Sequence, residues 1–154
     1  MKVFDVPGVG DALILSDDHP PPHVHFVHRG EGWTVKVRFS FLSDVAGTYG
    51  EIRMVGHRPT VRTVNEVLDY VEEKLPRCRE RWWAFRGTTG LEGRWAELGP
   101  MGMVRVPVLP HRPPRRVARA TYLIPTKEVR LVLDDGSGHV VKAGCGIEEA
   151  EEWS

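Results

Sequence analysis

The sequence predicts an α+β fold, in which a small, mostly antiparallel sheet packs against one long or kinked helix and a C-terminal β-hairpin module follows. Three observations predict it. Apolar and polar side chains alternate over residues 33–41, apolar side chains recur at helical spacing over residues 63–86, and short apolar runs flank an Asp-Asp-Gly turn at residues 134–136. The chain has 154 residues, of which 41% are hydrophobic, so it is long enough to bury a core.

Strands are expected in the N-terminal part. Short apolar runs at residues 12–15 and 24–27 predict two of them, and turn residues follow at 29–32. The strand at 33–41 is the clearest, because an apolar side chain at every second position gives it one buried face. A loop is expected at residues 43–50.

A helix is expected over residues 63–86. Its apolar face is formed by Val64, Val67, Leu68, Val71 and Leu75. Thr63 is expected to cap the N-terminus, with Glu66 three residues later completing a capping box. Pro76 cannot donate a backbone hydrogen bond, yet the apolar face continues beyond it in phase. We therefore expect a kinked helix or two abutting helices.

Three regions are expected along the chain: a histidine-containing α+β domain at 1–87, a linker rich in glycine, proline and arginine at 88–116, and a small β module with an acidic tail at 117–154. Apolar runs at residues 120–124 and 128–133 predict strands in the last region. A unit of this size does not bury enough surface to be stable alone. We therefore expect it to dock on the first domain or on another chain.

Composition limits the classes of function. The 21 basic residues balance the 21 acidic ones, so nucleic acid or an anionic membrane would have to bind at a local patch. No apolar run reaches bilayer length and the N-terminus lacks a signal-peptide pattern, so we expect a cytoplasmic protein with no membrane partner. Cys78 and Cys145 are far apart in the sequence and are expected to be reduced.

The segment with the most distinctive chemistry runs from His19 through three prolines to His23, Val24 and His25. Consecutive prolines favour a stiff, extended polyproline conformation. His23 and His25 are two residues apart in an expected strand, so their side chains share a face and lie roughly 6–7 Å apart at Cβ. Two imidazoles at that separation suit one metal ion or one phosphate group.

Three interpretations of this segment stay open. In the first, His19, His23 and His25 bind a divalent transition metal such as zinc. The candidates for the third ligand are, in descending order, His19, Asp17, Asp18, His57 and His28. In the second, His23 and His25 are catalytic, because an imidazole pair can give and take a proton near neutral pH. In the third, the histidines are half-buried structural groups and the prolines protect a sheet edge.

Two arginine clusters are the candidate nucleic-acid contacts. They comprise Arg77, Arg79, Arg81 and Trp83 in the expected helix, and Arg115 and Arg116 at the end of the expected linker. Arginines can hold phosphates while an aromatic ring stacks on bases. The alternative is a solvated helix face whose arginines pair with glutamates, with the linker arginines contacting the acidic tail instead.

With these residues in place, residues 12–85 resemble a bacterial domain family of unknown function that is marked by an acidic-His-Pro-Pro-His-x-His signature. The matching residues here run from Asp18 and His19 through the three prolines to His23, Val24 and His25. Residues 117–147 resemble a second small family of unknown function with a strand, Asp-Asp-Gly turn, strand pattern. The resemblance implies a fusion of two modules and a toxin-antitoxin-like pairing. It implies no established activity.

The sequence therefore favours an interaction or regulatory module of toxin-antitoxin-like type that contacts protein or nucleic acid. The main alternative is a metal- or histidine-dependent hydrolase, with RNA as one candidate substrate and His23 and His25 at its centre. The third is a structural component of a larger assembly.

Overall fold

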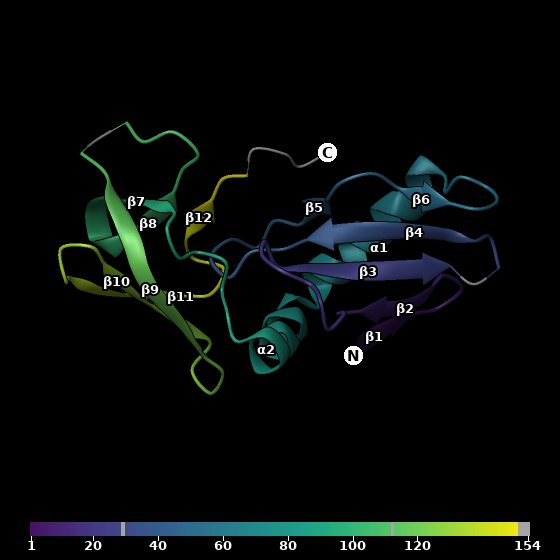
Figure 1. Ribbon diagram of the computed structural model, residues 1–154, viewed down its shortest axis with the longest axis horizontal. Coiled ribbons are helices and arrows are strands. Elements are labelled where there is room, and N and C mark those ends of the chain that lie inside the picture. The colour runs from purple at the N-terminus through teal and green to yellow at the C-terminus, as the bar shows by residue number, and fades with distance from the viewer. Residues whose placement is uncertain (29, 112, 151–154) are drawn as a thin grey trace.

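The computed structural model describes residues 1–28, 30–111 and 113–150. Over these residues the protein is mostly β, with twelve strands in two six-stranded sheets and two short α-helices. The expected α+β fold, with one sheet packed against one long helix, is therefore wrong. Figure 1 shows the two sheets arranged along the long axis of the molecule, with helix α1 behind the first sheet.

The first sheet is antiparallel and has the order β1-β2-β3-β4-β5, with β6 also pairing with β4. Its strands are β1 (Lys2–Val6), β2 (Gly10–Leu13), β3 (His23–His28), β4 (Trp33–Arg38), β5 (Gly47–Thr48) and β6 (Arg53–Met54). The alternation expected over residues 33–41 is confirmed for Trp33, Val35 and Val37, which are fully buried. It is wrong beyond them, because β4 ends at Arg38 and both Arg38 and Ser40 are buried. The sequence had predicted no strand where β1 lies.

The helical segment forms two abutting helices, which is one of the two arrangements expected for it. α1 spans Val61–Glu73 and α2 spans Leu75–Arg86. Pro76 lies in the first turn of α2, where a missing N–H costs no helical hydrogen bond. The N-cap of α1 is Thr60, whose side chain accepts a hydrogen bond from the N–H of Thr63. The capping box expected at Thr63 is therefore wrong, because the helix begins before that residue.

The second sheet has the order β11-β10-β9-β7-β8-β12. Its strands are β7 (Trp95–Leu98), β8 (Val104–Val106), β9 (Arg115–Leu123), β10 (Glu128–Leu133), β11 (Gly138–Lys142) and β12 (Ile147–Glu148). A short 3-10 helix, Pro100–Gly102, connects β7 to β8. The expected linker at 88–116 thus supplies β7, β8 and the start of β9, because these strands pair with partners distant in sequence.

The two sheets share one buried core. Phe41, which follows β4, contacts Tyr122 of β9 with ring centroids 5.0 Å apart. Glu148 of β12 is 6% exposed and accepts hydrogen bonds from Arg38 and Ser40 beside the first sheet. The C-terminal strands therefore dock on the N-terminal part, which is one of the two arrangements expected. Within the described ranges, no helix is long and apolar enough to cross a membrane.

Candidate functional site

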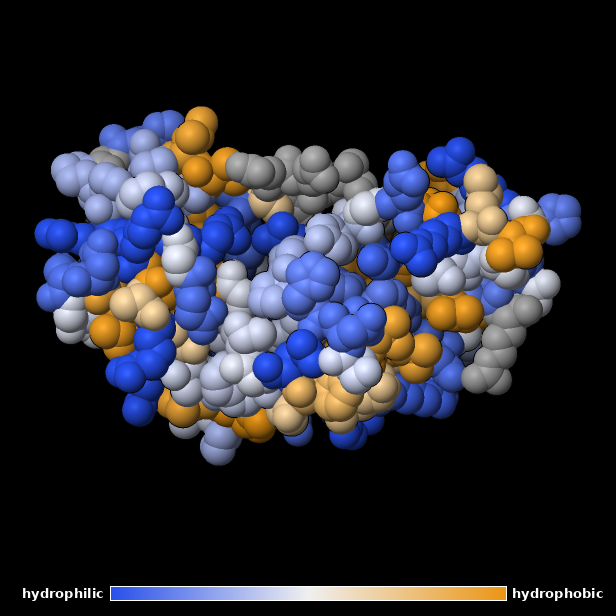
Figure 2. Space-filling view, in the orientation of Figure 1, coloured by the Kyte–Doolittle hydropathy of each residue, from blue (hydrophilic) through white to orange (hydrophobic). Residues whose placement is uncertain are grey.

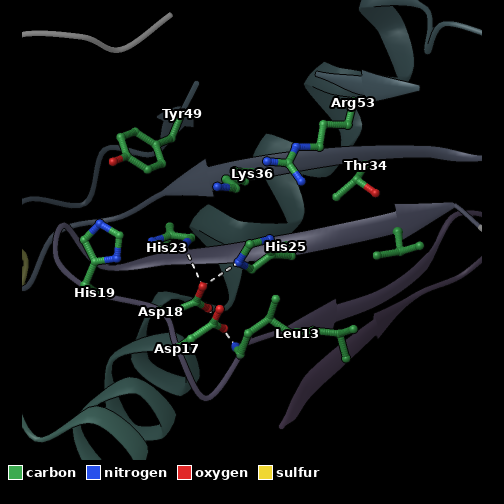
Figure 3. A pocket seen from close by; sticks show the side chains of 12 residues that line it. Leu13, Asp17, Asp18, His19, His23, His25, Thr34, Lys36, Tyr49 and Arg53 are labelled. Carbon is green, nitrogen blue, oxygen red and sulfur yellow. Dashed lines mark hydrogen bonds and ion pairs between the residues drawn. The ribbon is translucent and has the colours of Figure 1, made fainter. Parts of the chain in front are cut away.

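His23 and His25 project from β3 on the same face of the first sheet (Figure 3). The ring of His23 also lies against Trp82 of α2, with ring centroids 5.5 Å apart. Their neighbours Val24 and Phe26 point to the opposite face and are fully buried in the core. The two imidazole rings lie with centroids 4.9 Å apart. The shared face expected for the two histidines is confirmed.

The proline segment fixes the position of His23. The carbonyl oxygen of Pro21 accepts a hydrogen bond from Nδ1 of His23 at 2.8 Å. The ring of Pro22 packs against Gly90, where an added Cβ would lie 2.9 Å from Pro22 Cδ. The backbone at Gly90 has φ +73, a conformation that glycine adopts easily. Glycine also has no Cβ that would collide with Pro22. The peptide bond between Pro20 and Pro21 is cis, unlike the extended polyproline conformation expected.

Asp18 brings a carboxylate to the two histidines. Its Oδ2 accepts a hydrogen bond from the N–H of Leu15 at 2.7 Å, which orients the carboxylate. Its Oδ1 lies 2.8 Å from Nε2 of His25 and 3.2 Å from Nε2 of His23. Asp18, His23 and His25 are 7%, 3% and 7% exposed. One ligand atom from each lies within 4.8 Å of the other two. We call these three residues the Asp-His-His cluster.

The contact between His23 and Asp18 contains no hydrogen bond. The carbonyl oxygen of Pro21 can only accept, so Nδ1 carries the ring proton of neutral His23 and Nε2 presents a lone pair. This buried Nε2 has no hydrogen-bond partner in the part of the chain that the structure describes. It faces Oδ1 of Asp18 across 3.2 Å. Two acceptors at this distance repel each other unless a cation or a further proton lies between them.

Electrostatics favour the unprotonated form of both groups. Burial lowers the pKa of His23 below the ordinary 6.5, although the hydrogen bond to Pro21 and the charge of Asp18 act in the opposite direction. Burial raises the pKa of Asp18, but the hydrogen bonds from Leu15 and His25 outweigh it and leave the pKa below the ordinary 3.8. Near neutral pH, His23 is therefore neutral and Asp18 is ionised.

The spacing of the three ligand atoms suits a metal ion. Two ligands at about 2.1 Å from a tetrahedral ion lie about 3.4 Å from each other. The separation of 3.2 Å between Asp18 and His23 is close to this value, and opening the 2.8 Å hydrogen bond between Asp18 and His25 slightly would match it too. A metal-ligating histidine usually donates its other ring N–H to a carbonyl or carboxylate, as His23 does here.

The Asp-His-His cluster lines one side of a pocket of about 410 Å³, a size typical of small-molecule sites. Another side carries Lys36 and Arg53, and Figure 3 shows both side chains over β4 on the same face as His25. Apolar side chains complete the lining, among them Leu13 and Val27. Figure 2 views this face of the molecule and shows hydrophilic residues over β3 and β4 bordered by hydrophobic ones.

Asp18 occupies the position expected for His19 as the third ligand. His19 is exposed and lines the pocket, but the three-ligand group found among the described residues does not include it. Asp17 also lines the pocket and is exposed. His57 is exposed, and the Nδ1 of His28 accepts a backbone N–H. The sequence signal for this ligand was an acidic residue, Asp18, directly before the histidine-proline segment. Only the fold shows that the carboxylate of Asp18 lies against the histidines of β3.

The expected nucleic-acid residues differ in their environments. Arg79 is 3% exposed and donates hydrogen bonds to the carbonyl oxygens of Ser40 and Ser43. Its guanidinium is therefore buried and hydrogen-bonded within the chain. The other members, some exposed and some partly buried, are Arg77, Arg81, Trp83, Arg115 and Arg116. Arg116 lies over the ring of Trp95 at 3.7 Å. The structure thus removes Arg79 from the surface.

The sequence reasoning missed the cationic side of the pocket. Lys36 is the register partner of His25 in the β3-β4 pair, and Arg53 is the register partner of Thr34 in the β4-β6 pair. Register partners lie on the same face of a sheet, so these pairings bring both cations to the histidine face. The alternation of β4 identified Lys36 as facing away from the core, but the strand register does not follow from the local pattern.

The chain was also compared with known proteins. Neither a scan against protein-family models nor searches among curated proteins and solved structures finds a match to this chain. The resemblance to two families of unknown function therefore stays a prediction, and the functional argument rests on the geometry of the Asp-His-His cluster and its pocket.

Proposed function

We propose that the protein binds a divalent transition metal such as zinc through Asp18, His23 and His25, and uses it for hydrolysis. One observation supports this most strongly: the lone pair on Nε2 of His23 faces the ionised Oδ1 of Asp18 across 3.2 Å in the protein interior. A divalent cation placed between these atoms replaces one repulsive contact with two attractive ones.

The composition of the cluster supports hydrolysis as the reaction. Two histidines and one carboxylate are typical of catalytic zinc sites, in which water takes the remaining position. A divalent metal held by these three residues would supply hydroxide near neutral pH, because it would lower the pKa of bound water. The chain's own contribution is orientation: the carbonyl of Pro21 holds His23, and the N–H of Leu15 holds Asp18. The adjoining pocket gives a substrate access to the cluster.

Zinc titration of chelator-treated protein tests the proposal. We expect one zinc per chain, bound more weakly by a factor of at least about 100 in Asp18→Asn, His23→Gln and His25→Gln. His57→Gln is the matched control, because His57 is exposed and lies outside the Asp-His-His cluster. Equal zinc affinity in the wild type and the three variants would contradict the metal centre. The same ligand set also holds iron(II) in oxygenases, so a preference for iron(II) over zinc would contradict hydrolysis.

The other expected functions stay predictions. The interaction or regulatory role of toxin-antitoxin-like type and the role in a larger assembly depend on partners, and the contacts described within this chain do not bear on them. The same holds for the cytoplasmic location. RNA loses some support as a substrate, because Arg79, one of the arginines expected to hold phosphates, is buried and hydrogen-bonded within the chain.

A further inference from the structure

We infer that the pocket beside the Asp-His-His cluster binds the phosphoryl group of a phosphate monoester through Lys36 and Arg53. The inference rests on the proposed metal centre, which would contact the same phosphoryl group from the opposite side. It adds a substrate class to that centre. The argument uses the position of the two cations, the charge of the pocket and its apolar side.

Lys36 carries a positive charge next to the cluster. It stands opposite His25 in the β3-β4 register, so its side chain rises from the same face of the sheet. Its Nζ lies 5.9 Å from the ring centroid of Tyr49, which also lines the pocket. Among the described residues, no carboxylate forms an ion pair with Lys36.

Arg53 adds a second positive charge on the same side. It comes from β6, which pairs with β4 so that Arg53 stands opposite Thr34. Figure 3 shows its guanidinium extending over β4 toward Lys36. Within the described ranges, no carboxylate pairs with Arg53 either. Two neighbouring cations without an acidic partner repel each other, and an oxyanion between them removes that repulsion.

The charge of the lining favours a dianion. The carboxylates of Asp17 and Asp18 balance Lys36 and Arg53 among the acidic and basic residues that line the pocket. A divalent ion on the Asp-His-His cluster leaves the pocket with two positive charges in excess. A phosphate monoester in its fully ionised form carries two negative charges and neutralises this excess, whereas a phosphate diester carries only one.

The remaining lining suits the organic part of a small ester. Leu13, Leu15 and Val27 give the pocket an apolar side. The volume of about 410 Å³ is typical of sites that hold small molecules. In hydrolysis, a bond forms between phosphorus and the water oxygen while the bond between phosphorus and the alcohol oxygen breaks. One proton of the water passes to the alcohol.

Calorimetric titration of phenylphosphonate into zinc-loaded protein tests the inference, because this analogue of a monoester cannot be hydrolysed by breaking a P–O ester bond. We expect Lys36→Met and Arg53→Met each to weaken its binding about 10-fold, since each removes one charged hydrogen-bond donor. Arg58→Met is the matched control, because Arg58 is exposed and lies outside the pocket lining. Diphenyl phosphate, a diester, is expected to bind at least about 10-fold more weakly than phenylphosphonate.

Zinc affinity measured in the same variants separates this inference from the metal centre. If Lys36→Met and Arg53→Met bind both zinc and phenylphosphonate as the wild type does, the anion site is overturned and the metal centre stands. Tighter binding of the diester overturns the monoester. If the wild type binds no zinc, the proposed function fails, and phenylphosphonate is titrated into metal-free protein. Binding that depends on Lys36 and Arg53 then supports the anion site, and binding that does not depend on them overturns it.

Discussion

Among the described residues, the buried charged side chains around Glu148 and those of the Asp-His-His cluster differ in the contacts that the chain supplies to their carboxylates. In the cluster around Glu148, between the two sheets, both carboxylate oxygens of Glu148 accept hydrogen bonds. Oε1 accepts from Ser40 Oγ at 2.9 Å, and Oε2 accepts from Arg38 Nη2 at 2.8 Å and from Arg94 Nη1 at 3.3 Å. The backbone N–H of Glu148 also donates to Ser43 Oγ at 2.7 Å. Every charged oxygen of this cluster has a donor from the chain itself.

The Asp-His-His cluster is equally buried but incomplete. Oδ1 of Asp18 faces two Nε2 atoms, and one of them, on His23, has no proton to donate in its neutral form. Burying a polar group without a hydrogen bond costs free energy. Nε of Arg38, in the cluster around Glu148, also makes no hydrogen bond within the described residues, although Nη2 of Arg38 pairs with Glu148. The Asp-His-His cluster differs because its buried Nε2 faces an ionised carboxylate oxygen at 3.2 Å. The contacts of Glu148 link the two sheets, whereas the contact between Asp18 and His23 supports the proposal that the Asp-His-His cluster binds a metal ion.

The largest effect is expected at Glu148. Glu148→Ala removes the carboxylate that accepts from Arg38 and Arg94, and it leaves a buried positive charge without that compensation. We expect the free energy of unfolding to fall by about 3–5 kcal/mol, measured by urea denaturation. Glu51→Ala, at an exposed position, is the control. A loss below about 1 kcal/mol in Glu148→Ala would show that this cluster does not hold the sheets together.

A ligand effect of similar size is expected at the other cluster. Zinc that binds the folded chain at 100 times its dissociation constant should raise the free energy of unfolding by about 2.7 kcal/mol. The increase should fall to about 0.4 kcal/mol or less in Asp18→Asn and persist in Glu51→Ala. Urea denaturation with and without zinc measures it. Equal stabilisation of Asp18→Asn and the wild type would mean that zinc acts elsewhere on the chain.

In metal-free protein, Asp18→Asn should change the free energy of unfolding only slightly. The amide of Asp18→Asn can donate to Nε2 of His23, which replaces the contact between two acceptors with a hydrogen bond, although the charged hydrogen bond with His25 is lost. These effects oppose each other, so we expect the free energy of unfolding of metal-free protein to change by less than about 1 kcal/mol. A loss as large as that of Glu148→Ala would remove the contrast between the two clusters.

The contrast also shows what the sequence could and could not predict. Alternation placed His23 and His25 on one face without any knowledge of the fold, because a strand has a side-chain period of two. The position of Asp18 depends on a bend before the prolines, and the positions of Lys36 and Arg53 depend on strand register. None of these follows from local periodicity.

Glu148 illustrates the same limit in the second sheet. Its sequence context indicated an acidic tail rather than a strand of a sheet, yet it lies in β12 and is 6% exposed. The cause is the short strand β12, which pairs in parallel with β8 so that Ile147 stands opposite Arg105. A two-residue strand has no periodicity to detect, and its partner lies in the region expected as a linker. Residues 151 and 152 of the expected tail lie outside the described residues.

The smallest expected effect is a dependence of stability on pH. Because the pKa of His23 is lowered in the folded chain, the unfolded chain binds more protons as the pH falls through the ordinary value of 6.5. Metal-free wild type should therefore lose stability relative to His23→Asn between about pH 7.5 and about pH 5.5, by less than about 1.4 kcal/mol per pH unit. Urea denaturation at the two pH values measures this difference.

His57→Asn, at an exposed position, should keep the wild-type dependence of stability on pH. If His23→Asn keeps it as well, folding does not lower the pKa of His23, and burial of the ring is balanced by its contacts with Pro21 and Asp18.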